Sequence, residues 1–224
     1  ALKSLSLCKL SDSTDLIIFI DGPRRKSDER KIRNNITIAN LYKNSFNSLR
    51  VIQSSTNKGC ATSILDGIDE IFHQYENIIV LEDDIEVSLY FLDFMNNSLK
   101  IFQDQENVHH INGYNFKINS SMIKNAEISS VLLSKMFCWG WATWKNRWLN
   151  MTNNPLSNDP YYIMDSIPKK ERYIFNLENS YMWWNQIEGN ASGEIETWAI
   201  FWFAHIFLAK GLCVTPIISL TRNL

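Results

Sequence analysis

The residues most capable of chemistry in this sequence are three consecutive carboxylates, Glu82, Asp83 and Asp84. Adjacent carboxylates at the end of an apolar segment repel one another unless a cation or a set of hydrogen bonds offsets their charge. Hard oxygen ligands suit Mg²⁺ or Mn²⁺, which use one or two carboxylates and complete their shell with water and phosphate. The cluster therefore predicts a metal site beside a phosphate. The alternative is that these acids only cap a following helix.

A fourth acid, Asp21, ends another apolar segment and is followed by Gly22 and Pro23. Gly and Pro favour a tight turn, which leaves the carboxylate projecting from the end of that segment. Such a carboxylate can accept a hydrogen bond from an N–H group of a nucleobase. The alternative is an Asp that forms the turn and is satisfied by its own backbone.

Tryptophan is concentrated in the second half of the chain. All eight Trp residues follow residue 135, and three of them lie in the segment 139–144 (WGWATW). Their faces can stack on the C–H faces of sugars in a binding pocket, but large aromatic side chains more often fill a core. Both uses remain open for this segment.

The histidines and cysteines predict no further metal site. His109 and His110 are adjacent on an expected strand, where neighbouring side chains point to opposite faces, so they are poorly placed to share an ion. The cysteines occur singly, without a CxxC pair, and we expect buried free thiols in a reducing compartment. They are Cys8, Cys60, Cys138 and Cys213.

Short apolar strands must position the acids. Residues 16–20 and 77–81 are continuous apolar runs, typical of strands buried on both faces, and they end at Asp21 and Glu82. Further strands are expected at 49–52, 108–114 and 131–133, and helices at 26–42, 61–75, 89–102 and 198–208.

Alternating strands and helices with short connections predict an α/β domain with a mostly parallel central sheet flanked by helices. Ligands of such sheets bind beyond the carboxyl ends of the strands. Asp21 and the cluster at 82–84 both lie there, so we expect them to share one site. No low-complexity linker interrupts the chain, which favours a single domain.

The composition excludes several classes of protein. With 224 residues, 45% hydrophobic and 21% charged, the chain can bury a sizeable core and is neither disordered nor fibrous. A net charge of -2 predicts no nucleic-acid partner. No apolar run reaches the length of a transmembrane segment, so we expect a cytoplasmic protein whose membrane contact, if any, is peripheral and at the inner face.

Five short segments carry a resemblance to known enzymes: 19–24 (FIDGPR), 57–67 (NKGCATSILDG), 79–85 (IVLEDDI), 139–144 (WGWATW) and 196–199 (ETWA). Through them, in the same order, the chain resembles the GT-A-fold glycosyltransferases, particularly N-acetylglucosaminyltransferase-I-like and family 2-like bacterial sugar transferases. The resemblance implies a Rossmann-like GT-A fold and a role in polysaccharide assembly. It also implies an inverting transfer from a nucleoside-diphosphate sugar, with UDP expected, to a saccharide or lipid-linked hydroxyl, dependent on Mn²⁺ or Mg²⁺.

The resemblance implies roles for individual residues as well. Asp84 corresponds to the acid that holds the metal, and Glu82 and Asp83 to contacts with the donor sugar and ribose. Asp21 corresponds to the acid that reads the base. The other residues implied at the donor pocket are Asn57, Gly59, Trp139, Gly140 and Trp141, with Lys58 as a phosphate contact.

An acceptor hydroxyl is a poor nucleophile, so inverting relatives use a carboxylate to remove its proton. Glu196 is the candidate for this base, and the alternative is that it caps a helix beginning near Thr197. Ala199 stands where many relatives carry a second acid. The remaining candidates for the base are Asp159, Asp165, Glu188 and Glu194.

The resemblance divides one catalytic domain, residues 1–224, into a nucleotide-sugar-binding half (1–135) and an acceptor-side half (136–224). Relative to the family, the first strand and a C-terminal segment are missing, which predicts a domain truncated at both ends. Two other functions remain open. A nucleotidylyltransferase would need a Gly-rich, basic loop that is not found, and a non-catalytic carbohydrate-binding module would explain the tryptophans but not the acids. The donor sugar and the acceptor are not determined by these motifs.

Overall fold

The computed structural model describes residues 1–117 and 129–224. Within them the strands form a two-stranded sheet β1-β2, a five-stranded sheet in the order β3-β7-β5-β8-β6, and a two-stranded sheet β4-β9. The strands are β1 (Asp15–Ile20), β2 (Ser48–Gln53), β3 (Asn77–Val80), β4 (Ile85–Val87), β5 (Val108–Asn112), β6 (Ser130–Leu133), β7 (Trp141–Trp144), β8 (Leu212–Pro216) and β9 (Thr221–Asn223).

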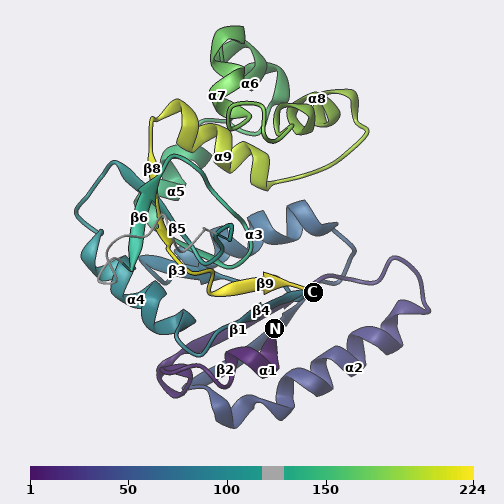
Figure 1. Cartoon of the computed structure of the whole chain (residues 1–224). Coiled ribbons are helices and arrows are strands. Elements are labelled where there is room, and N and C mark those ends of the chain that lie inside the picture. The colour runs from purple at the N-terminus through teal and green to yellow at the C-terminus, as the bar shows by residue number, and fades with distance from the viewer. Residues whose placement is uncertain (118–128) are drawn as a thin grey trace.

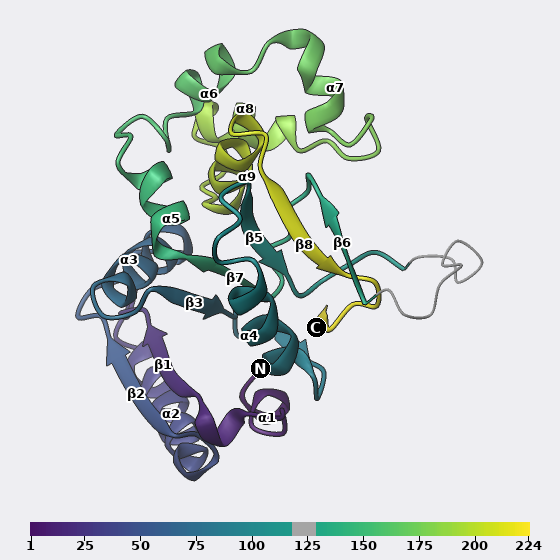
Figure 2. The ribbon, with the colours of Figure 1, turned by 90° about the vertical axis from the view of Figure 1, so that its left-hand side faces the viewer.

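The helices lie at both ends of the molecule and around the five-stranded sheet. Helix α2 lies beside β1 and β2 at one end, whereas α6, α7 and α8 gather at the opposite end beyond α9 (Figures 1 and 2). The helices are α1 (Leu2–Leu5), α2 (Asp28–Leu41), α3 (Cys60–Phe72), α4 (Phe91–Ile101), α5 (Lys145–Thr152), α6 (Pro160–Ser166), α7 (Arg172–Phe175), α8 (Trp184–Ser192) and α9 (Ala199–Leu208). The four helices expected from the sequence are confirmed within a few residues at each end.

The five-stranded sheet is mixed. Strand β7 runs antiparallel to both β3 and β5, and β6 runs antiparallel to β8, so that β5 and β8 are the parallel neighbours. The α/β class is therefore confirmed, but the mostly parallel sheet is not. Part of the difference comes from β7, which was not expected because its four residues are all buried and show no alternation that would indicate a strand. The rest comes from β6, an expected strand that runs antiparallel to β8.

The parallel pair β1-β2 forms a sheet of its own. The register runs from Asp15 opposite Ser48 to Ile20 opposite Gln53. Within the described residues β1 pairs with β2 alone, and its apolar residues are half-buried instead of buried on both faces as expected. Asp21 and Glu82 therefore follow strands of two different sheets.

Strand β9 brings the end of the chain to the acidic cluster. It pairs with β4 in antiparallel register, with Asn223 opposite Ile85 and Thr221 opposite Val87. The backbone N–H of Leu224 donates to the carbonyl of Asp84 over 3.0 Å. Figure 1 shows β9 beside β4, so residues far apart in sequence are neighbours here.

Apolar side chains cover both faces of the five-stranded sheet. On one face Trp141, Trp148 and Trp202 are fully buried in a cluster formed largely by α5 to α9. On the other face, Phe91 and Met95 of α4 are fully buried with neighbouring aliphatic residues. None of the helices in the described ranges is long and apolar enough to cross a membrane.

The cysteines are free thiols, but they are not all buried as expected. Cys8 and Cys213 are buried, whereas Cys60 is exposed and Cys138 is half-buried. The last two line a cavity described below, which explains their exposure.

Candidate active site

A cavity of about 290 Å³ brings together residues from distant parts of the chain. Glu82 and Asp84 reach it from the loop after β3, Trp139 from the loop before β7, and Glu196 from the connection between α8 and α9. The other lining residues are Cys60, Ala61, Cys138, Gln186, Thr197, Trp198, Ala199 and Asn223. Candidates for the metal ligand, the sugar platform and the base thus share one space.

The acidic side of the cavity contains carboxylates in mutual repulsion. Burial raises the pKa of Glu82, and the charges of Asp84 and Asp83 raise it further. The residues that follow form strand β4, and the next helix, α4, begins only at Phe91. The cluster is therefore not a helix cap, which was the alternative interpretation.

The amide of Asn223 donates to Oδ2 of Asp84 over 3.0 Å. In the described part of the chain, the other carboxylate oxygen of Asp84 has no hydrogen-bond partner, and it remains free to bind a ligand. Asp83 is exposed and is not among the residues that line the cavity.

The oxygen donors of the cavity fit a hard divalent cation that binds together with a substrate. No three His, Cys, Asp or Glu side chains of the described residues are arranged to hold a metal ion by themselves. Mg²⁺ and Mn²⁺ commonly take one or two carboxylates from the protein and the rest of their ligands from water and phosphate. Asp84, with Glu82 beside it, fits that pattern.

Glu196 lies exposed on the connection between α8 and α9. Helix α9 begins at Ala199, and no side chain caps its first turn, so the helix-capping alternative for Glu196 is not observed. Of the other candidates for the base, Asp159 caps α6 and Glu188 accepts a hydrogen bond from Trp184 Nε1. Neither they nor Asp165 and Glu194 line the cavity.

Asn190 of α8 fastens the connection that carries Glu196. Its Oδ1 accepts from the backbone N–H of Thr197 over 3.1 Å, and its Nδ2 donates to Thr197 Oγ1 over 2.9 Å and to the carbonyl of Gln186 over 2.7 Å. One side chain thus holds both the backbone and the hydroxyl of the residue that follows Glu196.

The tryptophan-rich segment contributes one residue to the cavity and one to the core. Trp139 is 37% exposed and lines the cavity. Trp141 is fully buried, with its ring stacked on His110 at 5.1 Å, so its position is that of a core residue. Gly140 has φ +73°, a left-handed conformation that turns the chain between the two tryptophans.

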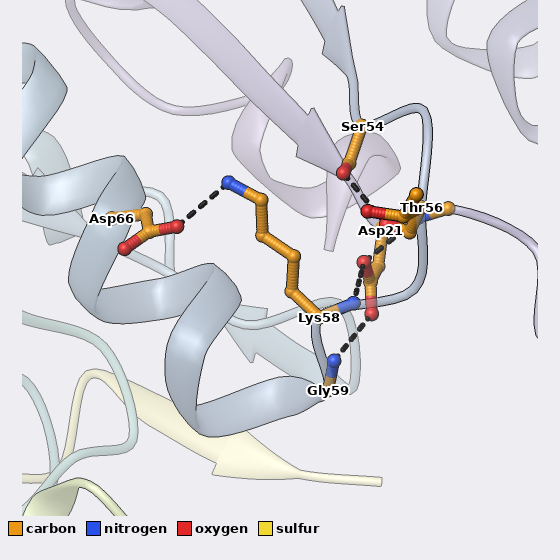
Figure 3. Close-up of polar contacts among 7 residues, drawn as sticks. Asp21, Ser54, Thr56, Lys58, Gly59 and Asp66 are labelled. Carbon is orange, nitrogen blue, oxygen red and sulfur yellow. Dashed lines mark hydrogen bonds and ion pairs between the residues drawn. The ribbon is translucent and has the colours of Figure 1, made fainter.

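The carboxylate of Asp21 is surrounded by donors. Oδ1 accepts from the backbone N–H groups of Gly22 and Lys58, both at 2.8 Å, and Oδ2 accepts from Asn57 Nδ2 at 2.8 Å and from the N–H of Gly59 at 2.9 Å. Figure 3 shows the Lys58 and Gly59 nitrogens directed at this carboxylate. Burial alone would raise the pKa of Asp21, but the backbone hydrogen bonds outweigh it and lower the pKa.

These four donors occupy the acceptor positions that a carboxylate offers. Asp21 therefore connects the end of β1 to the loop 57–59. The alternative interpretation was a turn-forming Asp that is satisfied by its own backbone. Here the carboxylate is satisfied within the protein, but three of its four donors belong to a loop distant in sequence. Gly22 permits this approach, since a Cβ there would collide with the backbone of Thr56. Lys58 Nζ turns away and pairs with Asp66 Oδ2 at 2.7 Å (Figure 3).

Asp21 lines a second cavity, of about 300 Å³, between the ends of β1 and β2 and helix α3. Lys58 lines this cavity, whereas Cys60 and Ala61 line the first one, so the two spaces flank the N-terminal end of α3. Burial raises the pKa of the Cys60 thiol, and the charges of Glu82, Asp83 and Asp21 raise it further. Asp21 was expected to share one site with the acidic cluster, but it lines a cavity next to the one that Glu82 and Asp84 line.

A family model described as glycosyltransferase family 25 (LPS biosynthesis protein) matches residues 13–180. The chain belongs to glycosyltransferase family 25. The expected glycosyltransferase is therefore confirmed, whereas the match does not specifically support the resemblance to family 2-like or N-acetylglucosaminyltransferase-I-like enzymes. No curated protein gives a significant match to the chain.

The match to family 25 includes Asp21, the cluster at 82–84 and Trp139, and it ends before Glu196. Several cavity residues of this family 25 glycosyltransferase were not predicted, namely Gln186, Asn223, Cys60 and Cys138. Cys60 lies within the segment 57–67 that carries part of the resemblance, but neither its type nor that of the other three indicated a place in the site. They reach the cavity through the packing of α8, β9, α3 and the loop before β7.

Proposed function

We propose that this family 25 glycosyltransferase transfers a sugar from a nucleoside-diphosphate donor, with UDP as the first candidate, to a hydroxyl of a saccharide or lipid-linked acceptor. The observation that supports the proposal is the single cavity lined by Glu82, Asp84, Trp139 and Glu196. It combines oxygen ligands for a cation, an exposed aromatic face and an exposed carboxylate. A site of this composition suits the displacement of a diphosphate by a hydroxyl group.

On the acidic side, Asp84 is proposed to hold Mn²⁺ or Mg²⁺, with Glu82 beside it. The cation, when bound, would neutralise the charge of the departing diphosphate. Asn223 holds one oxygen of Asp84 and thereby orients its carboxylate. Repulsion from Asp83 and Asp84 favours cation binding, because it makes the ionised cluster costly without a counter-charge.

On the opposite side, Glu196 is proposed to accept the proton of the acceptor hydroxyl as its oxygen attacks the anomeric carbon. The bond from that carbon to the diphosphate oxygen breaks as the new glycosidic bond forms, and the nucleoside diphosphate leaves with the electron pair. A carboxylate that removes the proton from the attacking side predicts inversion of the anomeric centre. Trp139 offers its half-exposed face to a sugar ring.

The residues around Asp21 are proposed to contribute to nucleotide binding indirectly, by holding the loop 57–59 in place. Asn57 completes this network, because its Nδ2 also donates to the Gly22 carbonyl and its Oδ1 accepts from Arg24 Nε at 3.1 Å. A base N–H could reach Asp21 only by replacing one of the four present donors. Asp21, Asn57 and Gly59 therefore shape the loop at the N-terminal end of α3, where the second cavity opens.

The first test is calorimetric titration of UDP into the protein with and without Mn²⁺. Asp84→Ala should abolish metal-dependent binding and transfer, because it removes the proposed metal ligand. Asp12→Asn, an exposed acid outside the cavity, is the matched control and should bind UDP as the unmodified protein does. Retained metal-dependent binding in Asp84→Ala, or binding of glycans without any nucleotide, would contradict the proposal.

A further inference from the structure

Positive charge is concentrated in one short part of the chain. Residues 24–43 contain seven Lys and Arg residues and two acids, a net charge of +5. The rest of the chain contains 15 Lys and Arg and 22 Asp and Glu, a net charge of -7. The basic residues of this part are Arg24, Arg25, Lys26, Arg30, Lys31, Arg33 and Lys43.

Helix α2 presents much of this charge on its solvent side. Arg30, Lys31 and Arg33 are exposed, and helical spacing places Ile38 and Leu41 on the same side of the helix. Both apolar side chains face solvent, with 49% of Ile38 and 77% of Leu41 exposed. We call these five residues the basic face of α2.

The two acids of α2 lie in its first turn, and one of them borders the basic face. Asp28 and Glu29 are half-buried at the start of the helix, and Glu29 pairs with Arg33 over 3.4 Å. Within the described residues, Arg30 and Lys31 take part in no ion pair. Their charges are therefore available to an external partner.

The basic face continues into the loop before α2, where Arg24, Arg25 and Lys26 are exposed. Arg24 Nε donates to Asn57 Oδ1 in the network around Asp21. The positive surface thus extends from α2 to the loop that borders the second cavity.

Basic and aliphatic side chains on one helix face suit the surface of an anionic bilayer. The cations meet lipid headgroups, and the aliphatic side chains enter the boundary between headgroups and acyl chains. A nucleic acid would match the charge but would leave Ile38 and Leu41 without an apolar partner. The remaining charge of -7 would also oppose a polyanion that wraps around the protein.

The opposite end of the molecule offers a weaker version of the same pattern. Residues 169–178 contain three basic residues and two acids, a net charge of +1, near the exposed Tyr173 and Ile174. Since α2 and α7 lie at opposite ends (Figure 1), one flat surface cannot contact both. The larger charge favours α2.

We propose that the basic face of α2, with the adjoining loop 24–26, docks this glycosyltransferase on an anionic lipid bilayer. The docking goes beyond the proposed sugar transfer and does not depend on it. It places the loop that borders the second cavity next to the lipid surface.

The test is co-sedimentation with vesicles of phosphatidylcholine alone and of phosphatidylcholine mixed with phosphatidylglycerol. The protein should bind the mixed vesicles, and added salt should weaken this binding. The double substitution Arg30→Gln/Lys31→Gln should weaken it about 30-fold, at about tenfold for each 1.4 kcal/mol and about 1 kcal/mol for each charge. Leu41→Ser should weaken it by a smaller factor.

Two matched controls lie elsewhere on the molecule. Lys169→Gln/Lys170→Gln removes the same charge from exposed residues at the opposite end. Ile218→Ser removes an apolar side chain with the same 77% exposure as Leu41. Both should bind mixed vesicles as the unmodified protein does, and circular dichroism should show that every variant is folded.

The proposal is overturned if the protein does not bind, or binds both kinds of vesicle equally. It is also overturned if the control substitutions weaken binding as much as those on α2. A duplex oligonucleotide that binds through Arg30 and Lys31 when vesicles do not would assign the face to nucleic acid. Self-association that is lost in Leu41→Ser would assign it to a second copy of the chain. UDP titration of the same variants tells a failure of docking from a failure of the proposed transfer.

Discussion

At the scale of single residues, the carboxylate of Asp21 accepts hydrogen bonds from four donors of the protein itself, so it has no free acceptor position for a ligand. Three of them are backbone N–H groups, which a side chain of another type would leave unpaired. The same residue that the motifs associate with a nucleobase is thus an anchor of the loop 57–59. The contribution of these hydrogen bonds to the stability of the fold should depend on pH.

Asp21→Asn should lower the free energy of unfolding at pH 7 by about 1–2 kcal/mol, because an amide cannot accept from all four donors. The pKa of Asp21 is lowered in the folded state, so its stabilisation is complete above the ordinary pKa of 3.8 and disappears as pH falls through the folded value. The difference between variant and unmodified protein should therefore shrink below pH 3.8. Urea unfolding at pH 7 and at pH 3 measures it, and a constant difference would contradict this account.

At the scale of elements, the connection between α8 and α9 determines where Glu196 lies. Glu196 itself is exposed. Asn190 of α8 fastens the neighbouring backbone through two hydrogen bonds to Thr197, and a third hydrogen bond, to the Gln186 carbonyl, holds the Asn190 side chain within α8. Strand β9 positions a residue on the other side of the cavity, because it places Asn223 next to Asp84, to which its side chain donates a hydrogen bond. The cavity is therefore positioned by elements that lie outside the motifs.

Asn190→Ala should lower the rate of sugar transfer about 10- to 100-fold if Glu196 is the base proposed above, because small displacements of a catalytic group cost rates of this order. Binding of UDP with Mn²⁺ should be unchanged, since Asn190 does not line the cavity. Steady-state kinetics and calorimetry measure the two effects. Asn185→Ala on the same helix has an exposed side chain and is the control. If Asn190→Ala weakened nucleotide binding by as large a factor as it lowers the rate, the hydrogen bonds of Asn190 would stabilise the whole cavity and not Glu196 in particular.

At the scale of the whole molecule, histidines in the core make stability depend on pH. His110 accepts from Trp202 Nε1 at 3.1 Å and lies 3.2 Å from the Phe137 carbonyl through its other nitrogen, which fixes the neutral tautomer with Nε2–H. Burial lowers its pKa to about 3, and burial lowers the pKa of His205 to about 4. The unfolded chain binds these protons near pH 6.5, so stability should fall as pH drops below that value.

His205→Phe should stabilise the protein. Within the described residues, the buried Nε2 of His205 has no hydrogen-bond partner, and a phenyl ring would keep the stacking on Trp202, whose ring lies 5.5 Å away. We expect a gain of about 1 kcal/mol at pH 7 from removing an unsatisfied polar atom. The gain should grow between pH 6.5 and pH 4, because the variant no longer has this proton to exclude. Thermal unfolding across that range measures it, and a gain independent of pH would exclude the titration of His205 as its cause.

Much of the candidate site was predictable from local patterns. The runs 16–20 and 77–81 predicted strands that end at acids, and helical spacing predicted α3 and α4, because turn chemistry and side-chain periodicity are properties of neighbouring residues. The glycosyltransferase was predicted by the resemblance that five short segments carry, one of which contains the acidic cluster. That function is the one shown by membership of family 25.

Tertiary structure alone decided which of these residues meet. It placed β7 antiparallel between β3 and β5, assigned Trp139 to the cavity and Trp141 to the core, and brought Asn223 to Asp84. It also brought to the carboxylate of Asp21 the hydrogen-bond donors of a loop more than thirty positions further along the chain. The physical reason is that strand pairing and burial depend on contacts between segments distant in sequence, and these contacts leave no periodic trace in either segment.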